Sequence, residues 1–255
     1  MPINFTVIFR DSLNFVRNKP KFLLNFSLIF SVEILVLNFL FGQINPAFAS
    51  GINIQPGEFV FTRSILGLAI ISLLLNVILY AFTILRVHQI SYQKTTNWQA
   101  IFYIFSKKIL TLILTMIIVT LPILMGAVNL IIASLQGSAS VASLLISIVG
   151  LFIFIRLNLT FVDCLITADS FVNSFKRVWL IGARQNKNLI VFFLINYLVF
   201  PFISNNIAHI FADNTVLAPI FIWLSSVVYV FSLVFTYRFY TCFMQVNSVS
   251  SVENK

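Results

Sequence analysis

Six long runs of apolar residues alternate with short polar segments along the 255-residue chain. The runs cover residues 22–41, 65–85, 109–135, 141–162, 189–211 and 216–237. An α-helix rises about 1.5 Å per residue, so about 20 apolar residues cross the hydrocarbon core of a bilayer, which is roughly 30 Å thick. Backbone N–H and C=O groups find no water in that core, and a helix pairs them internally. The pattern therefore predicts an all-α membrane protein, a six-span transmembrane helical bundle that forms a single domain over residues 1–255.

Three further stretches, residues 4–17, 97–106 and 169–182, carry an apolar stripe at helical spacing with polar side chains opposite it. A helix with a strong apolar face and a basic opposite face is typical of the membrane interface. Each stretch precedes a basic cluster and a predicted span, so we expect three interfacial amphipathic helices at the cytoplasmic face. Polar segments beside a membrane are often amphipathic and basic, which leaves an ordinary juxtamembrane loop as the alternative.

The basic residues are distributed with the same alternation. Fourteen of the sixteen Lys and Arg residues lie in the two tails and in every second gap between the apolar runs. Only Arg63 lies in the other gaps, and only Arg156 lies within a run. Because cytoplasmic loops carry an excess of Lys and Arg, this distribution predicts cytoplasmic N- and C-termini in a bacterial inner (plasma) membrane. Anionic headgroups of the lipid bilayer then account for the net charge of +9, and no nucleic acid is expected as a partner.

Composition narrows the class of protein further. Charged residues make up 9% of the chain, against about 25% in soluble domains, which excludes a soluble globular protein. The sequence contains no HExxH motif, no glycine-rich phosphate loop and no pair of intramembrane carboxylates. We therefore expect no enzymatic activity, no catalytic residues, no cofactor and no metal. Cys164 and Cys242 lie at predicted cytoplasmic span ends, so both are expected to be reduced thiols.

The first apolar run has one alternative interpretation. Ala47-Phe48-Ala49 follows the run and resembles the small-residue site at which signal peptides are cleaved. The run is longer than the usual 7–15 residues of a signal peptide, which favours a retained span. Cleavage would leave five spans in the same orientation.

Two charged residues lie inside the apolar runs, Glu33 in the first and Arg156 in the fourth. An intramembrane charge costs about 2.5–3.5 kcal/mol on insertion scales, so it suggests a function by default. The two predicted spans are antiparallel, and helical side chains lean toward their own N-terminus, which brings the two groups closer in depth. Three interpretations follow: a structural ion pair; no pair, with Arg156 reaching the interface and Glu33 protonated; or a small-solute transporter or channel that uses both residues.

Three short segments carry a family resemblance: FRDSLNFVRN at residues 9–18, ADSFVNSFKRVWLIGARQNKN at residues 168–188, and YRFY at residues 237–240. They resemble the YciC-type family of uncharacterised bacterial inner-membrane proteins, which has six predicted spans at a similar length. The resemblance covers the layout of the whole chain but only these three patches in residues. It implies a polytopic inner-membrane protein of unknown activity. The matching family-motif residues are Arg10, Asp11, Phe15, Arg17 and Asn18.

The patterned polar chemistry lies at the predicted cytoplasmic face. Arg10 and Arg17 of the first stretch and Lys176 and Arg177 of the third are candidate contacts to anionic headgroups. They favour a role in envelope or lipid homeostasis, with a membrane-protein partner left open. The alternative is the solute path that Glu33 and Arg156 suggest.

Overall fold

The computed structural model describes residues 3–44, 63–92, 98–135, 141–167, 169–210, 214 and 216–252. In these ranges the regular elements are all helices, so the predicted all-α class is confirmed. Six helical segments are long and apolar enough to cross a membrane, which indicates a multi-pass membrane protein. These segments are Pro20–Ile44, Gly67–Ser91, Trp98–Asn129, Leu144–Ile166, Asn186–His209 and Ala218–Gln245. The Ala47-Phe48-Ala49 motif lies outside the described residues.

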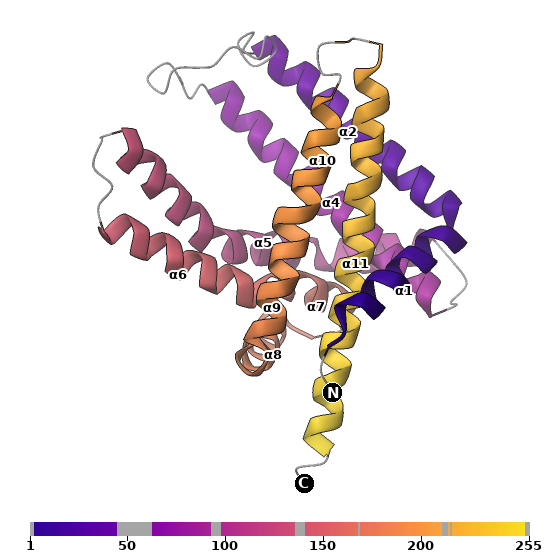
Figure 1. Ribbon diagram of the computed structural model, residues 1–255, viewed down its shortest axis with the longest axis vertical. Helices are drawn as coiled ribbons and strands as arrows, with labels where there is room; N and C mark the ends of the chain where they lie inside the picture. Colours follow the sequence, from indigo (N-terminus) through magenta and orange to yellow (C-terminus); the bar gives the residue numbers. More distant parts are fainter. Residues whose placement is uncertain are drawn as a thin grey trace.

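The last helix, α11 (Ala218–Val252), is the centre of the bundle. It packs against α10 (Phe200–His209), α2 (Pro20–Ile44) and α4 (Arg63–Ser91), and α1 (Phe5–Asn18) crosses it near its C-terminal part (Figure 1). Aromatic rings fill much of this centre: Phe192 and Phe5 both stack on Phe239, with ring centroids 4.3 Å and 5.6 Å away. Large aromatic rings bury much apolar surface, and this burial contributes strongly to the stability of the core.

Helices α5 (Trp98–Leu135) and α6 (Val141–Leu157) form a hairpin that slants away from α10 and α11 (Figure 1). Two glycines let the two helices approach closely. A Cβ atom on Gly150 would lie 2.3 Å from the carbonyl oxygen of Pro122, and one on Gly126 would lie 2.7 Å from Cα of Ser147. Small residues at the contact of two membrane helices bring the backbones together in this way.

Two of the three predicted amphipathic helices are separate elements, α1 and α8 (Phe171–Arg184). The N-terminus of α1 is capped by Asn4, whose side-chain oxygen accepts from the backbone N–H groups of Thr6 and Val7. The predicted third helix at residues 97–106 is not separate, which corrects the sequence prediction. Helix α5 runs without a break from Trp98 to Leu135, because residues 98–121 contain no Gly or Pro that would end it.

Two of the spans are discontinuous. The fourth ends its first helix at Leu157 and turns at Asn158 and Leu159 before the short α7 (Thr160–Ile166). The fifth consists of α9 (Asn186–Phe193), the π-helix η1 (Leu194–Val199) and α10. Apolar runs in the sequence predict the length of a span but give no sign of such breaks.

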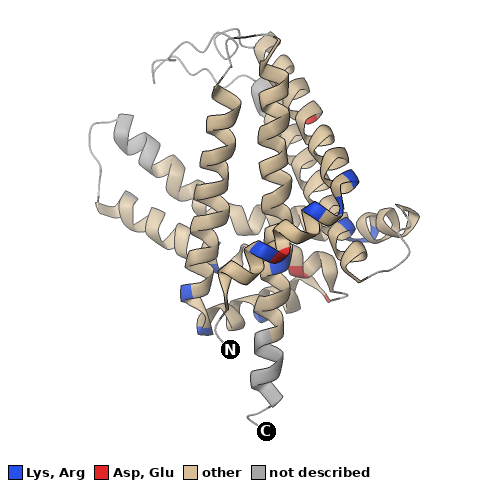
Figure 2. Cartoon of the chain, turned by 45° about the vertical axis from the view of Figure 1, so that its right-hand side comes forward, with Lys and Arg blue, Asp and Glu red and all other residues tan. Residues whose placement is uncertain are grey.

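Apart from Arg63 at the start of α4, the Lys and Arg residues drawn in Figure 2 gather in one half of the bundle. This half contains α1, α8 and the C-terminal part of α11 (Figure 1). The two cysteines are free thiols, Cys164 buried and Cys242 partly buried, as predicted.

Candidate functional site

Glu33 lies in the middle of α2 and points to α4. The side-chain nitrogen of Asn76 donates a hydrogen bond to one carboxyl oxygen of Glu33 at 3.0 Å. The same nitrogen donates to the backbone carbonyl of Ser72 at 3.1 Å, which fixes the orientation of the amide. Among the described residues the second carboxyl oxygen of Glu33 has no partner, so a polar ligand could reach it.

A cavity of about 370 Å³ opens beside this pair. A cavity of this size can hold a small organic molecule. Helices α2, α4, η1, α10 and α11 all contribute to its wall, which includes both polar and apolar side chains. The polar lining residues are Glu33, Asn76, Tyr80, Asn196, Tyr197, Ser204, Asn205, Ser225, Ser226, Tyr229 and Ser232.

A second cavity of about 440 Å³ adjoins the first, between α4, the α5–α6 hairpin and η1. The two cavities share four wall residues, Asn76, Tyr80, Tyr197 and Tyr229. The rest of the second cavity is mostly apolar.

Asn158 is the exception in this apolar wall. It is 6% exposed, and neither its side-chain nitrogen nor its side-chain oxygen has a hydrogen-bond partner among the described residues. A buried polar group without a partner costs about 1–3 kcal/mol, so this amide is open to a hydrogen bond from a water or from a polar group of a ligand. Asn158 sits at the turn that interrupts the fourth span, which places its amide at the cavity.

The break in the fifth span also brings polar groups to the cavities. Pro201 has no N–H and cannot donate to the carbonyl of Tyr197, and the π-helix η1 precedes it. Asn196 and Tyr197 lie on this π-helix, and Asn196 is held by a 3.1 Å hydrogen bond from the hydroxyl of Thr236. Short π-helical segments occur frequently at functional sites.

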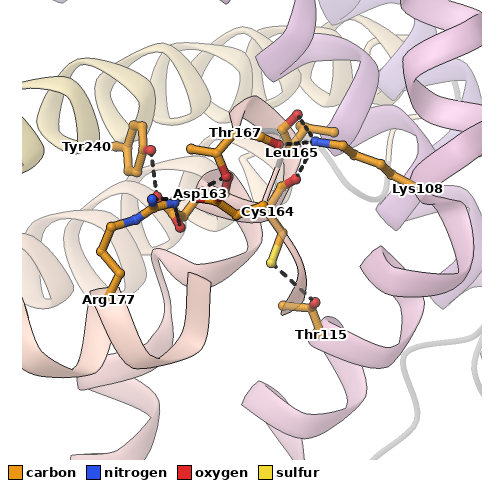
Figure 3. A network of polar contacts seen from close by, with 9 residues as sticks. Lys108, Thr115, Asp163, Cys164, Leu165, Thr167, Arg177 and Tyr240 are labelled. Atoms are coloured by element: carbon orange, nitrogen blue, oxygen red, sulfur yellow. Dashed lines mark hydrogen bonds and ion pairs between the residues drawn. The ribbon is translucent and has the colours of Figure 1, made fainter. Parts of the chain in front are cut away.

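A second polar cluster lies around Asp163 of α7 (Figure 3). Asp163 is fully buried and accepts hydrogen bonds from the Arg177 guanidinium at 2.5 Å and from the Tyr240 hydroxyl at 2.7 Å. Arg177 also forms a 2.5 Å ion pair with Asp169. The cluster joins α7, α8 and α11. We call Asp163, Arg177 and Tyr240 the clamp.

The Lys108 amino group extends the clamp to α5. It donates to the backbone carbonyls of Cys164 at 2.8 Å and Leu165 at 3.3 Å, and to that of Thr167 (Figure 3). The last carbonyls of a helix lack intrahelical partners, so a cation at the C-terminus of α7 stabilises it. Two sets of contacts therefore fix this short helix, those to the Asp163 side chain and those to the carbonyls at its C-terminus.

The environment of Arg177 keeps it charged. Partial burial alone would lower the pKa of the guanidinium, but the hydrogen bonds and charges of Asp163 and Asp169 outweigh burial and raise the pKa above its ordinary value. Arg177 was a predicted headgroup contact. The structure instead directs its guanidinium to two carboxylates, so its role is to hold α8 against α7.

The candidate Glu33–Arg156 ion pair is not formed, which agrees with the alternative that the two residues do not pair. The Arg156 Nε donates to the side-chain oxygen of Asn186 at 3.2 Å, and the guanidinium lies over the rings of Phe152 and Trp179 at 4.9 and 4.8 Å. Arg156 is in the last turn of α6 and faces α8 and α9, whereas Glu33 faces α4. Arg156 lines neither cavity.

The residues of the first family motif separate into two groups. Arg10, Asp11, Arg17 and Asn18 are exposed, as is Lys176 of α8. Phe15 is buried, and the Arg238 guanidinium lies 5.3 Å from its ring. Phe15 is thus a packing residue that joins α1 to α11.

Several site residues were missed by the sequence reasoning. Asn76 and Asn196 were visible as amides inside apolar runs, a composition that usually indicates hydrogen bonds between helices. Nothing in the sequence distinguished Asn158 or the three cavity tyrosines from the other residues of the apolar runs. Among the described residues there is no cluster of three His, Cys, Asp or Glu side chains that could hold a metal ion.

Sequence comparison relates the chain to an uncharacterised protein of Haemophilus influenzae. The two are 29% identical over 247 residues, which is 96% of this chain and 100% of the relative. No family model matches the chain, and no solved structure matches it. The description of the relative names no activity.

Proposed function

We propose that this protein is a non-enzymatic membrane protein that binds a small organic solute beside Glu33 and carries it within the bundle. The observation that carries the proposal is the Glu33–Asn76 pair at a cavity walled by five helical segments, two of which belong to an interrupted span. Interrupted helices around a polar site near the middle of the membrane are typical of secondary transporters. An intramembrane carboxylate with an open cavity beside it fits the same class.

The wall chemistry favours an organic cation. Glu33 is the only Asp, Glu, Lys, Arg or His among the lining residues of the two cavities. Tyr80, Tyr197 and Tyr229 lie in both walls, and aromatic rings with a carboxylate are how proteins commonly recognise amines and quaternary ammonium groups. The proposed path runs between the two cavities past these shared residues.

Binding to purified protein in lipid nanodiscs tests the proposal. Benzyltrimethylammonium and the neutral benzyl alcohol form a matched pair of probes, and calorimetry measures their affinities. We expect the cation to bind at least about tenfold more tightly, a difference of about 1.4 kcal/mol. Glu33→Gln should remove this preference, since it removes the charge and keeps the shape.

Arg156→Gln is the matched control, because Arg156 lies outside both cavities. Its affinity for the cation should stay within about twofold of the parent protein, a change of less than about 0.5 kcal/mol. Equal binding of both probes, or loss of binding in Arg156→Gln but not in Glu33→Gln, would argue against a solute site at Glu33.

A second candidate function is contact with anionic headgroups in envelope or lipid homeostasis, favoured by the surface of α1. Phe9 and Leu13 are 42% and 47% exposed and adjoin the exposed Arg10 and Arg17 on the helix. An apolar edge beside basic side chains suits the membrane interface. Replacing Arg10 and Arg17 by Gln should lower retention of anionic lipid, measured by native mass spectrometry, and unchanged retention would count against this role.

We further propose a bacterial inner-membrane location with both termini in the cytoplasm, and membership of the YciC-type family. The gathering of basic residues in one half of the bundle supports the orientation. Cysteines introduced at Arg10 and at Ser64 test it: a membrane-impermeant thiol reagent added to intact cells should label only the second. No particular partner protein is implied.

A further inference from the structure

A groove of about 880 Å³ opens at the junction of α1 and α2 and reaches the ends of α4 and α5. It shares no lining residue with the cavities at Glu33. One end of the groove is basic and the other is apolar.

Three cations form the basic end: Lys19 between α1 and α2, Lys21 in the first turn of α2, and Arg86 near the end of α4. No acidic residue lines the groove. The Arg86 guanidinium lies 4.7 Å above the ring of Trp98, and its Nη1 atom is buried without a hydrogen-bond partner among the described residues. A guanidinium fixed on an aromatic ring, with an unused donor, is prepared to bind a phosphate.

Leu28 and Ile29 belong to the apolar end, and they are 51% and 45% exposed. Leu28 comes seven residues after Lys21 on the same helix, which places it about 10 Å further along α2. A molecule that fits both ends has an anionic head and an apolar tail of at least this length. Trp98 at the mouth is the residue type that membrane proteins place at headgroup level.

We propose that this groove is a binding site for one anionic phospholipid, whose phosphate contacts Lys19, Lys21 and Arg86 and whose acyl chain follows Leu28 and Ile29. The site is independent of the solute proposal and requires only that α2 crosses a bilayer. It also differs from general attraction of the bilayer to basic helices, because one lipid occupies a defined position.

Native mass spectrometry of the protein released from nanodiscs tests the site. Nanodiscs of phosphatidylglycerol mixed with phosphatidylcholine should yield protein with one retained phosphatidylglycerol. Lys19→Gln with Lys21→Gln should lower this retention by about fivefold per charge, and both side chains are exposed, so folding is spared. Arg86→Gln should lower it at least as much, with partial recovery in Arg86→Lys.

Lys176→Gln with Arg184→Gln is the matched control, since it removes two exposed charges of α8 outside the groove. This variant should retain the lipid. Equal losses in the two double variants would show general attraction to the bilayer and overturn the site. Displacement of the lipid by millimolar glycerol 3-phosphate would show a site for a soluble phosphate and overturn it as well.

Discussion

Two carboxylates lie inside this bundle and are held in opposite ways. Asp163 is fully buried, and a guanidinium and a phenol hydroxyl donate to its two oxygens. Glu33 receives one hydrogen bond, from Asn76, and faces a cavity. A buried charge with all its partners is costly to disrupt, because removal of one partner leaves the other unpaired, whereas a charge with a free oxygen at a cavity is available to a ligand. The clamp therefore has the contacts of a structural site, and the Glu33 cavity those of the proposed ligand site.

The largest effect is expected at the clamp. Asp163→Asn leaves Arg177 and Tyr240 without their acceptor charge, and breaking a buried ion pair costs about 3–5 kcal/mol. Because the Arg177 side chain is 35% exposed, the lower end of this range is expected. Thermal unfolding in detergent, followed by circular dichroism, measures the loss.

Asp169→Asn is the control for that prediction. Asp169 pairs with the same arginine but its side chain is 41% exposed, so its loss should cost at most about 1 kcal/mol. If the two variants unfold at the same temperature, burial does not distinguish the two carboxylates, and the structural reading of the clamp fails.

The next effect concerns the hairpin that walls the second cavity. Gly150→Ala places a methyl group against the Pro122 carbonyl oxygen, where an ideal Cβ would lie 2.3 Å away. Overpacking of this kind costs about 1–3 kcal/mol. Binding of benzyltrimethylammonium should weaken with it, because α5 and α6 shift, while the clamp between α7, α8 and α11 stays intact.

Gly67→Ala is the matched substitution in α4, since no atom lies within 4 Å of the added methyl group. It should be neutral or stabilise the helix by up to about 1 kcal/mol. Equal destabilisation by both glycine variants would mean that close packing of the hairpin does not set the shape of the cavity.

A smaller effect of opposite sign is expected at Asn158. Asn158→Leu replaces two unpartnered polar atoms by a larger apolar side chain of the same branched shape, for which the adjoining cavity has room, so stability should rise by about 1 kcal/mol. Affinity for a solute with a polar group should fall. A destabilised Asn158→Leu would indicate that the amide has a structural partner, such as an ordered water, and would make this cavity resemble the clamp.

The sequence predicted the six long helical segments well, because the length of an apolar run depends on bilayer thickness and needs no tertiary contact. It also predicted α1 and α8, because an apolar stripe at helical spacing is likewise a local pattern that needs no tertiary contact. The prediction of a separate helix at residues 97–106 was wrong, because an amphipathic stripe does not show whether the helix ends or continues as part of α5.

The candidate sites were harder to predict. Glu33 was found because it is a rare charge in an apolar run, but its partner was assigned by charge alone. Which way a helix faces decides the contact, and Glu33 and Arg156 face different neighbours. The clamp depends on a hydrogen bond between residues 77 apart in sequence, and no local pattern signals it.

The smallest effect on stability is expected at Glu33, and this prediction tests the comparison most directly. Glu33→Gln keeps the contact with Asn76 and removes an intramembrane charge, which is costly to bury. The unfolding temperature should therefore stay the same or rise, although cation binding is lost. Asp163→Asn should show the reverse, a large loss of stability, with binding retained per folded molecule. If Glu33→Gln unfolds as readily as Asp163→Asn, then Glu33 is a second clamp and its cavity is not a ligand site.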